Sequence, residues 1–153
     1  MTLRDLQKLL AAGALAVALM SGARVLGASS PQVSASGAWI RWLPGTIPAA
    51  GYVTVRNGGD HAVTLLGAAT RDYGEVMFHE SRNQDGVERM LSIDSIRIEP
   101  HSQVTLAPRG LHIMLMEPAR SIKPGDHVVL TLRFADGLAL PVEFEVRKPD
   151  GSS

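Results

Sequence analysis

The stretch that decides the fold is HVVLTLRFADGLALPVEFEV, residues 127–146. It contains two apolar runs, His127–Phe134 and Leu138–Val146, separated by Asp136-Gly137. Alternation of apolar and polar residues, as in the second run, is typical of a β-strand with one buried face. Asp-Gly between two such runs is a strong hairpin signal, because these residues accept the positive φ angles of a tight turn. We therefore predict an antiparallel β-hairpin here.

Short apolar runs broken by turn residues continue through most of the chain. We predict seven further strands: Ala38–Leu43, Gly51–Asn57, Val63–Thr70, Glu75–Ser81, Glu88–Ile98, Gln103–Leu106 and Leu111–Met116. Turn signals such as Pro44-Gly45 and Asp85-Gly86 separate them at intervals of roughly 8–12 residues, which is typical of an all-β sandwich or barrel. There is no internal repeat, so the sequence predicts one all-β domain.

The amino-terminal segment has the layout of a secretory signal peptide. Arg4 and Lys8 form a short positive region, Leu9–Ala23 is an apolar run of fifteen residues, and small residues follow. A bilayer span needs about 20 residues, so an uncleaved anchor is the weaker alternative, and no Cys stands at the expected cleavage site to carry a lipid. We expect a periplasmic protein with no membrane contact beyond this segment. The expected organisation is a signal peptide at 1–28, a flexible lead-in at 29–35, a β-sandwich domain at 36–148 and a disordered tail at 149–153.

The composition argues against several functional classes. Lys+Arg and Asp+Glu are both 15, so the formal net charge is zero and there is no electrostatic footprint for nucleic acid. The chain has no cysteine, which rules out disulfides, a Cys nucleophile and a blue-copper electron-transfer site. Gly-x-Ser-x-Gly and His-Glu-x-x-His motifs are absent as well. We therefore expect a binding protein rather than an enzyme.

Two predicted strands place aliphatic and aromatic residues on one face and His and Met residues on the other. In the strand that begins at Glu75, alternation puts Met77 and His79 on one face. In Leu111–Met116 the face opposite the aliphatic residues carries His112, Met114 and Met116. Residues two apart on a strand emerge about 7 Å apart at their Cα atoms, so His112 and Met114 can converge on one ion.

His79 and Met90 lie on either side of the loop at residues 83–86. If that loop closes a hairpin, the two residues come near each other in space. Two neighbouring edges would then supply two ligands each to a site near the surface of a rigid sandwich.

Thioether sulfur combined with imidazole is the donor set that Cu(I) prefers. Calcium and magnesium prefer oxygen ligands, and zinc seldom takes a thioether. The ordinary interpretation stays open, because a strand Met is usually core filler and a lone strand His is usually a surface residue. Two interpretations of Met77 and Met116 stay open: they form an outer shell of methionines around the site, or they simply cover apolar surface. No ligand role is expected for His61, His101 and His127, which lie at turns or strand edges.

The four candidate ligands have the spacing His79-x10-Met90-x21-His112-x-Met114. This pattern resembles the periplasmic copper chaperone family, the PCu(A)C-like proteins, associated with the dinuclear copper centre of cytochrome c oxidase. The resemblance covers about residues 36–147 and includes Ala38–Arg41, Ala50–Tyr52, His79–Glu80, Asp85–Val87 and Gly110–Met116.

The resemblance implies a cupredoxin-like Greek-key β-sandwich that binds one Cu(I) per chain through His79, Met90, His112 and Met114. It implies delivery of the ion toward cytochrome c oxidase subunit II, a Sco-type protein, or both. Copper sequestration or resistance without a delivery partner is the alternative, since it needs the same site. An interaction module whose His and Met residues are only packing is the third hypothesis. We expect a monomer.

The chain departs from the family pattern in two places. Family members often carry paired glycines before the second His segment, and Arg109 replaces one of them here. This change is expected to alter the loop but not the ligands. Some members carry a His- and Met-rich tail for a second copper, whereas residues 147–153 contain neither residue. We therefore predict a single copper site.

Overall fold

The computed structural model describes residues 32–150 and residue 152, so the expected signal peptide lies outside the described residues. The described part of the chain forms ten strands. They are β1 (Val33–Arg41), β2 (Ala49–Asn57), β3 (Val63–Ala69), β4 (Tyr73–Gln84), β5 (Val87–Ile93), β6 (Ile96–Ile98), β7 (Ser102–Leu106), β8 (Leu111–Pro118), β9 (His127–Phe134) and β10 (Ala139–Arg147). Over these residues there is no helix long and apolar enough to cross a membrane.

The predicted hairpin around Asp136-Gly137 is confirmed. β9 and β10 pair antiparallel, with Leu132 opposite Leu140. Phe134 N donates to Leu138 O at 2.9 Å, and Gly137 N donates to Phe134 O at 3.1 Å. Gly137 has a φ of 88°, a left-handed conformation that glycine adopts without steric penalty.

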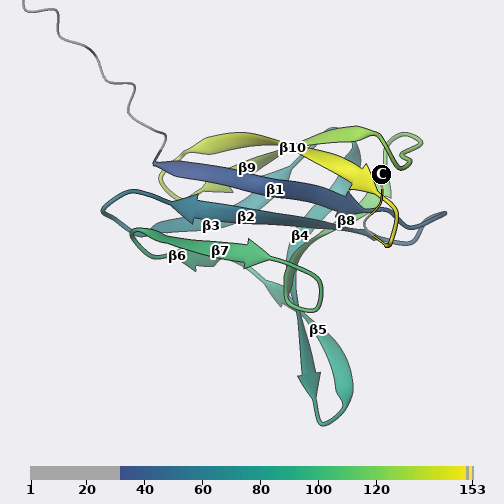
Figure 1. Ribbon diagram of the computed structural model, residues 1–153, viewed down its shortest axis with the longest axis horizontal. Helices are drawn as coiled ribbons and strands as arrows, with labels where there is room; N and C mark the ends of the chain where they lie inside the picture. The colour runs from purple at the N-terminus through teal and green to yellow at the C-terminus, as the bar shows by residue number, and fades with distance from the viewer. Residues whose placement is uncertain (1–31, 151, 153) are drawn as a thin grey trace, which may run out of the picture.

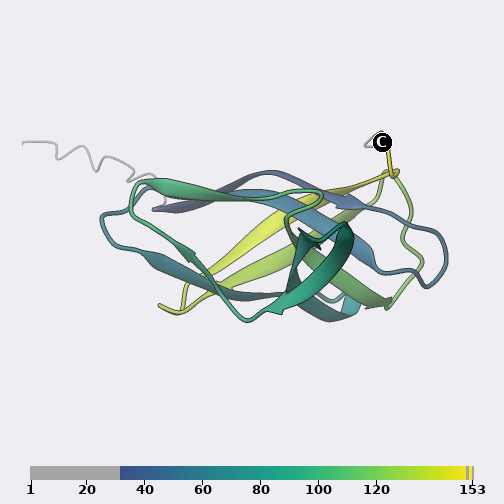
Figure 2. The ribbon, with the colours of Figure 1, turned by 90° about the horizontal axis from the view of Figure 1, so that it is seen from below.

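All ten strands belong to one continuous sheet. Nine of them follow the order β5-β4-β8-β2-β1-β10-β9-β3-β6. The tenth strand, β7, pairs with residues 53–57 of β2, next to the part of β2 that pairs with β8. Only the pairing of β1 with β10 is parallel among the pairings described. The sheet curls over itself into a flattened sandwich, which Figure 1 shows face-on and Figure 2 from below. This architecture confirms the predicted all-β sandwich.

The core lies between the layers of this sandwich and is mainly aliphatic, with a few aromatic side chains. Its largest side chains with less than 2% exposure are Phe144, Ile40, Leu65, Ile98, Leu106, Ile113, Leu115, Leu130, Leu132, Val53, Val55 and Val128. Gly51 permits close packing of β2 beside β8, because a Cβ atom there would lie only 3.3 Å from Cβ of Ile113. The core therefore uses the aliphatic face of β8 and leaves its His and Met face on the other side.

Two strand predictions need correction. β1 begins at Val33, whose side chain is only 4% exposed, so residues 33–35 of the expected flexible lead-in belong to the sheet. The predicted strand Glu88–Ile98 is two strands, β5 and β6, which lie at opposite ends of the strand order. The chain turns away between β5 and β6 because Ile96 and Ile98 of β6 are buried beside β3, whereas β5 is almost wholly exposed.

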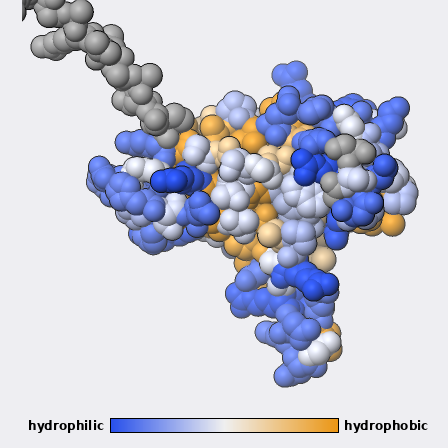
Figure 3. Space-filling model, viewed as in Figure 1, coloured by the Kyte–Doolittle hydropathy of each residue, from blue (hydrophilic) through white to orange (hydrophobic). Residues whose placement is uncertain are grey.

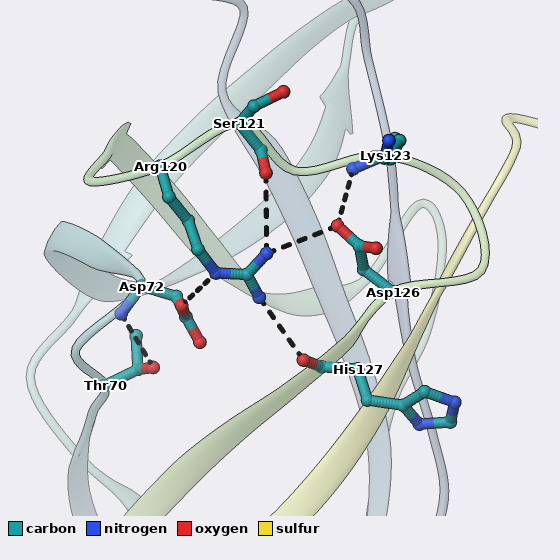
Figure 4. Close-up of polar contacts among 7 residues, drawn as sticks. All are labelled: Thr70, Asp72, Arg120, Ser121, Lys123, Asp126 and His127. Carbon is teal, nitrogen blue, oxygen red and sulfur yellow. Dashed lines mark hydrogen bonds and ion pairs between the residues drawn. The ribbon is translucent and has the colours of Figure 1, made fainter.

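An arginine fixes the connection between β8 and β9 (Figure 4). The Arg120 guanidinium donates from Nε to Asp72, in the turn before β4. It also donates to the carbonyl of His127 at 3.4 Å and to Asp126 at 3.3 Å. These contacts join the turn before β4 to the start of β9, which stabilises the end of the sandwich where β4 begins.

The hairpin of β4 and β5 projects from the body of the sandwich (Figure 1). Its two-residue turn, Asp85-Gly86, has φ values of 56° and 80°, the pair of positive angles that a type I′ turn requires. Gly86 N donates to Oδ1 of Asn83 at 3.0 Å, which closes the turn. Figure 3 shows that the projecting part is covered mainly by hydrophilic residues. The distal part of the hairpin, residues 82–92, is thus an exposed arm, whereas Phe78 of β4 belongs to the core.

Candidate metal centre

The two candidate histidines lie directly opposite each other on neighbouring strands. β4 and β8 pair antiparallel, and His79 is in register with His112. Their ring centroids are 5.9 Å apart, and the rings are nearly perpendicular, at 86°. The sequence placed each histidine beside a methionine on its strand, and the structure adds that the two imidazoles meet.

The His112 ring is oriented by the backbone. Its Nδ1 lies 3.1 Å from the carbonyl oxygen of Gly110. A carbonyl oxygen only accepts, so Nδ1 carries the proton and Nε2 keeps its lone pair for a ligand. His112 is only 5% exposed, so this ligand is more buried than a site near the surface suggests. A backbone acceptor behind a histidine is the usual way in which proteins fix the tautomer of a metal-binding imidazole.

The His79 ring presents a buried nitrogen without a partner. Nδ1 of His79 is inaccessible to solvent and has no hydrogen bond. Burial, and second the charge of His112, lower the pKa of His79 below its ordinary value. Both effects favour the neutral imidazole, which is the form that binds a metal. An orphaned buried nitrogen is costly unless something else occupies it, and a soft cation suits its chemistry.

Met90 enters the site from the projecting hairpin. β4 and β5 pair with Met90 opposite Ser81, which places Met90 diagonally across from His79 on the same face of the sheet. Its side chain is 56% exposed. The prediction that the loop at 83–86 closes a hairpin and brings His79 and Met90 together is confirmed. Met90 is the most accessible of the four candidate ligands.

Met114 completes the set from the middle of β8. It lies in register with Met77 of β4 and with Ala50 of β2. Because residues two apart share a face, Met114 is on the same side of the sheet as His112, and it is partly buried. The register therefore brings all four candidate residues to one face, opposite the core.

Sequence reasoning missed the charged and aromatic residues that surround this face. A surface cavity contains both His112 and Met90, and its wall includes Arg41, Tyr52 and Glu88. The Nε atom of Arg41 is buried and unpartnered. Burial raises the pKa of Tyr52, against an opposing effect of Arg41. The only available signal was alternation in β1 and β2, which puts Arg41 and Tyr52 on the face away from Ile40.

The replaced glycine has a backbone consequence. Arg109 has a φ of 68°, in the left-handed region that glycine adopts freely. Gly110 follows it, and its carbonyl accepts from Ser81 N at 3.1 Å as well as from His112. The loop therefore holds the acceptor for His112 while Arg109 adopts a left-handed conformation that strains a non-glycine residue.

Two of the remaining histidines, His101 and His127, form side-chain contacts at the surface elsewhere. Nε2 of His101 lies 2.9 Å from Asp60, and Nδ1 of His127 lies 3.1 Å from Glu143, all with exposed side chains. Among the residues that the structure places, no three His, Asp or Glu side chains are grouped to hold a metal ion. A metal at this face would therefore need thioether sulfur in addition to the imidazoles.

Comparison with known proteins places the chain in a family. The family model described as "LpqE-like: Putative lipoprotein LpqE-like" matches residues 33–146. The chain belongs to the LpqE-like family. A curated relative of this LpqE-like protein is "Putative lipoprotein Lxx21020" of Leifsonia xyli subsp. xyli, which is 32% identical over 139 residues, or 90% of this chain and 83% of the relative.

Solved structures share the fold of this LpqE-like chain. "Copper-bound PCuAC domain from PmoF2" matches with a TM-score of 0.65 and 27% identity, over 77% of this chain and 94% of that one. "Solution structure of CuI-DR1885 from Deinococcus Radiodurans" matches with a TM-score of 0.62 and 31% identity, over 77% of this chain and 79% of that one. The resemblance to PCu(A)C-like proteins and the cupredoxin-like β-sandwich predicted from the sequence are confirmed.

Proposed function

We propose that this LpqE-like protein is a copper chaperone that carries one Cu(I) ion, bound by His79, Met90, His112 and Met114. The observation that carries the proposal is the register of β4 and β8, which sets the two imidazoles face to edge with a methionine on either side. Two related solved structures, the PmoF2 domain and DR1885, are described as copper-bound and CuI-bound.

The donor set suits a soft ion of low charge. All four proposed ligands are neutral when they bind, so the site adds no negative charge to offset a divalent ion. The wall of the cavity carries one positive side chain, Arg41, and one negative side chain, Glu88. Soft, polarizable thioethers favour Cu(I) over harder cations. The backbone acceptor leaves Nε2 of His112 free, and the buried Nδ1 of His79 has no hydrogen-bond partner.

The unequal exposure of the ligands suggests how the ion leaves. His112 is 5% exposed, whereas Met90 is 56% exposed on the projecting hairpin. A ligand from an acceptor can replace Met90 first while His79, His112 and Met114 still hold the ion. Stepwise replacement avoids releasing a free ion into solution. The barrier to transfer can therefore stay low even though the site binds copper tightly.

We further propose that the protein is exported to the periplasm and delivers copper toward cytochrome c oxidase subunit II, a Sco-type protein, or both. The signal-like amino terminus and the motif spacing support this destination. Sequestration is the competing function. Mixing the loaded protein with copper-free subunit II and following the metal separates the two, because a sequestering protein keeps its copper.

The binding site is tested by Cu(I) titration against a competing chelator. We expect one equivalent to bind, and Met90→Leu and Met114→Leu each to lower the affinity by about tenfold or more, which is about 1.4 kcal/mol. Met and Leu have similar volumes, so the fold should be retained. Val87→Ala is a matched control, since Val87 lies on the same hairpin with the same 56% exposure as Met90.

X-ray absorption of the loaded protein should count two nitrogen and two sulfur neighbours. Absence of stoichiometric binding, or affinity unchanged in both Met variants, would overturn the copper site and favour the interaction-module alternative.

A further inference from the structure

Two methionines that the proposed site does not use lie on the same face, next to Met114. The register of β4 and β8 forms a ladder of side-chain pairs: Glu75 with Met116, Met77 with Met114, and His79 with His112. Directly opposite residues have Cβ atoms about 4.5–5.5 Å apart, and successive pairs on one face are about 7 Å apart. Three thioethers, from Met77, Met114 and Met116, therefore occupy adjoining positions.

These methionines are not part of the hydrophobic core. The core face of the same two strands is filled by Phe78, Ile113 and Leu115, which are 3%, 0% and 1% exposed. Met77, Met114 and Met116 lie on the opposite face and are each partly exposed. Leucine would cover apolar surface equally well at these positions, so packing alone gives no reason for three sulfur atoms in one place.

We propose that Met77, Met114 and Met116 form an all-thioether position for a soft monovalent ion, Cu(I) or Ag(I), beside the His79/His112 position. The proposal rests on the proposed copper function and deepens it. Met114 belongs to both positions, so the two exclude each other and the chain still carries one ion. The ion moves one step along the ladder by exchanging Met77 and Met116 for the two imidazoles while Met114 stays bound.

The ladder gives the site two ends with different chemistry. At one end the exposed carboxylate of Glu75 lies opposite Met116 and attracts a cation. At the other end lies Met90, which is 56% exposed on β5 and is where the proposed acceptor exchange occurs. The all-thioether position lies toward the Glu75 end, so it serves uptake, and the His79/His112 position holds the ion more tightly before release.

The direct test removes the imidazoles and asks whether the thioethers still bind. In His79→Gln/His112→Asn, with methionine methyl groups labelled with carbon-13, Ag(I) should bind with one equivalent. The methyl resonances of Met77, Met114 and Met116 should shift, and that of Met90 should not. Adding Met77→Leu and Met116→Leu should abolish this binding. No saturable Ag(I) binding by the folded imidazole-free variant would overturn the proposal.

A second measurement uses the intact imidazoles, because His112 is buried and its replacement could unfold the chain. In Met77→Leu/Met116→Leu we expect the Cu(I) affinity to stay close to that of the unaltered protein, while the rate of uptake from a chelator falls by about tenfold. Ile93→Leu on β5 controls for a change in packing. An unchanged uptake rate would overturn the proposal.

The outcomes separate the two proposals. One outcome would reject the proposed function alone. In it, the unaltered protein does not bind the ion through His79 and His112, but the methyl groups of Met77, Met114 and Met116 still shift. Another outcome would reject the thioether position alone. In it, the ion binds through the imidazoles, Met77→Leu/Met116→Leu does not change the rate of uptake, and the imidazole-free variant does not bind.

Discussion

Among the residues that the structure describes, two buried nitrogens near the candidate site have no hydrogen bond: Nδ1 of His79 and Nε of Arg41. A buried polar atom without a partner costs about 1–3 kcal/mol of stability. For His79 a bound cation would relieve this cost. For Arg41 it would not, because a guanidinium carries positive charge and has no lone pair to donate to a metal. The two residues should therefore have opposite effects on copper affinity.

Arg41→Gln should raise the affinity for Cu(I). Arg41 lines the cavity that contains His112 and Met90, so its charge opposes the incoming cation. A partly screened charge interaction near the surface is worth about 1 kcal/mol, which corresponds to roughly a fivefold tighter complex. Competition titration measures it. Arg82→Gln is the control, since Arg82 is exposed and paired with Glu80 on the same arm. A weaker complex in Arg41→Gln would contradict this electrostatic interpretation.

Copper affinity should fall as the pH falls, because protons compete with the ion for the imidazoles. The pKa of His79 is lowered, mainly by burial, so this ring stays neutral below the ordinary value of 6.5. Protonation therefore removes His79 as a copper ligand only at more acidic pH. The same shift makes the folded apo-protein lose stability as the pH falls below 6.5, where only the unfolded chain takes up the proton.

Cu(I) titrations from pH 8 to pH 5 test this expectation. His79→Gln should show a shallower dependence than the unaltered protein, because one titrating ligand is gone. An affinity that stays flat over this range would contradict a role for the histidines.

At the scale of elements, the β4–β5 hairpin determines whether Met90 reaches the site. β5 is an edge strand of the sheet and pairs only with β4 among the described strands. Its position therefore depends on the Asp85-Gly86 turn, where Gly86 has a φ of 80°.

Gly86→Ala should loosen the hairpin and weaken Cu(I) binding. A Cβ at Gly86 would meet nothing within 4 Å, so the penalty is purely conformational, about 1–2 kcal/mol for a left-handed residue. Gly86→Asn should be nearly neutral, because Asn tolerates this conformation. The Cu(I) affinity and the methyl resonance of Met90 report the change. Equal affinities in the two variants would mean that the turn does not position Met90.

Elements with strong local signals were predictable from the sequence, and elements that depend on distant pairing were not. The 127–146 hairpin and the hairpin at 83–86 carry their own turn residues, so both were predicted. The break between β5 and β6 falls at Asp94-Ser95, without Gly or Pro, and was missed. His112-x-Met114 was visible as a pair on one face. The place of His112 opposite His79 depends on β8 lying between β4 and β2, and no local sequence pattern specifies that strand order.

At the scale of the whole molecule, the proposed site joins the exposed end of the sheet to its interior. Three strands supply the ligands: β5 at the edge, β4 next to it, and β8, which also pairs with β2. A bound ion would connect the projecting arm to a strand that packs on the core through Ile113 and Leu115. Metal binding should thus stabilise the folded chain as a whole and not only the hairpin.

Saturating Ag(I) should raise the free energy of unfolding. An ion at 100 times its dissociation constant adds about 2.7 kcal/mol if it binds only the folded state, which should raise the melting temperature by roughly 5–15 °C for a domain of this size. Ile98→Val, in β6 at the far end of the strand order, should lower stability by about 0.5–1.5 kcal/mol. It should leave the metal-induced increase unchanged, because distant sites act additively. Met114→Leu should instead reduce the increase, and the same increase in both variants would show that the ion binds elsewhere.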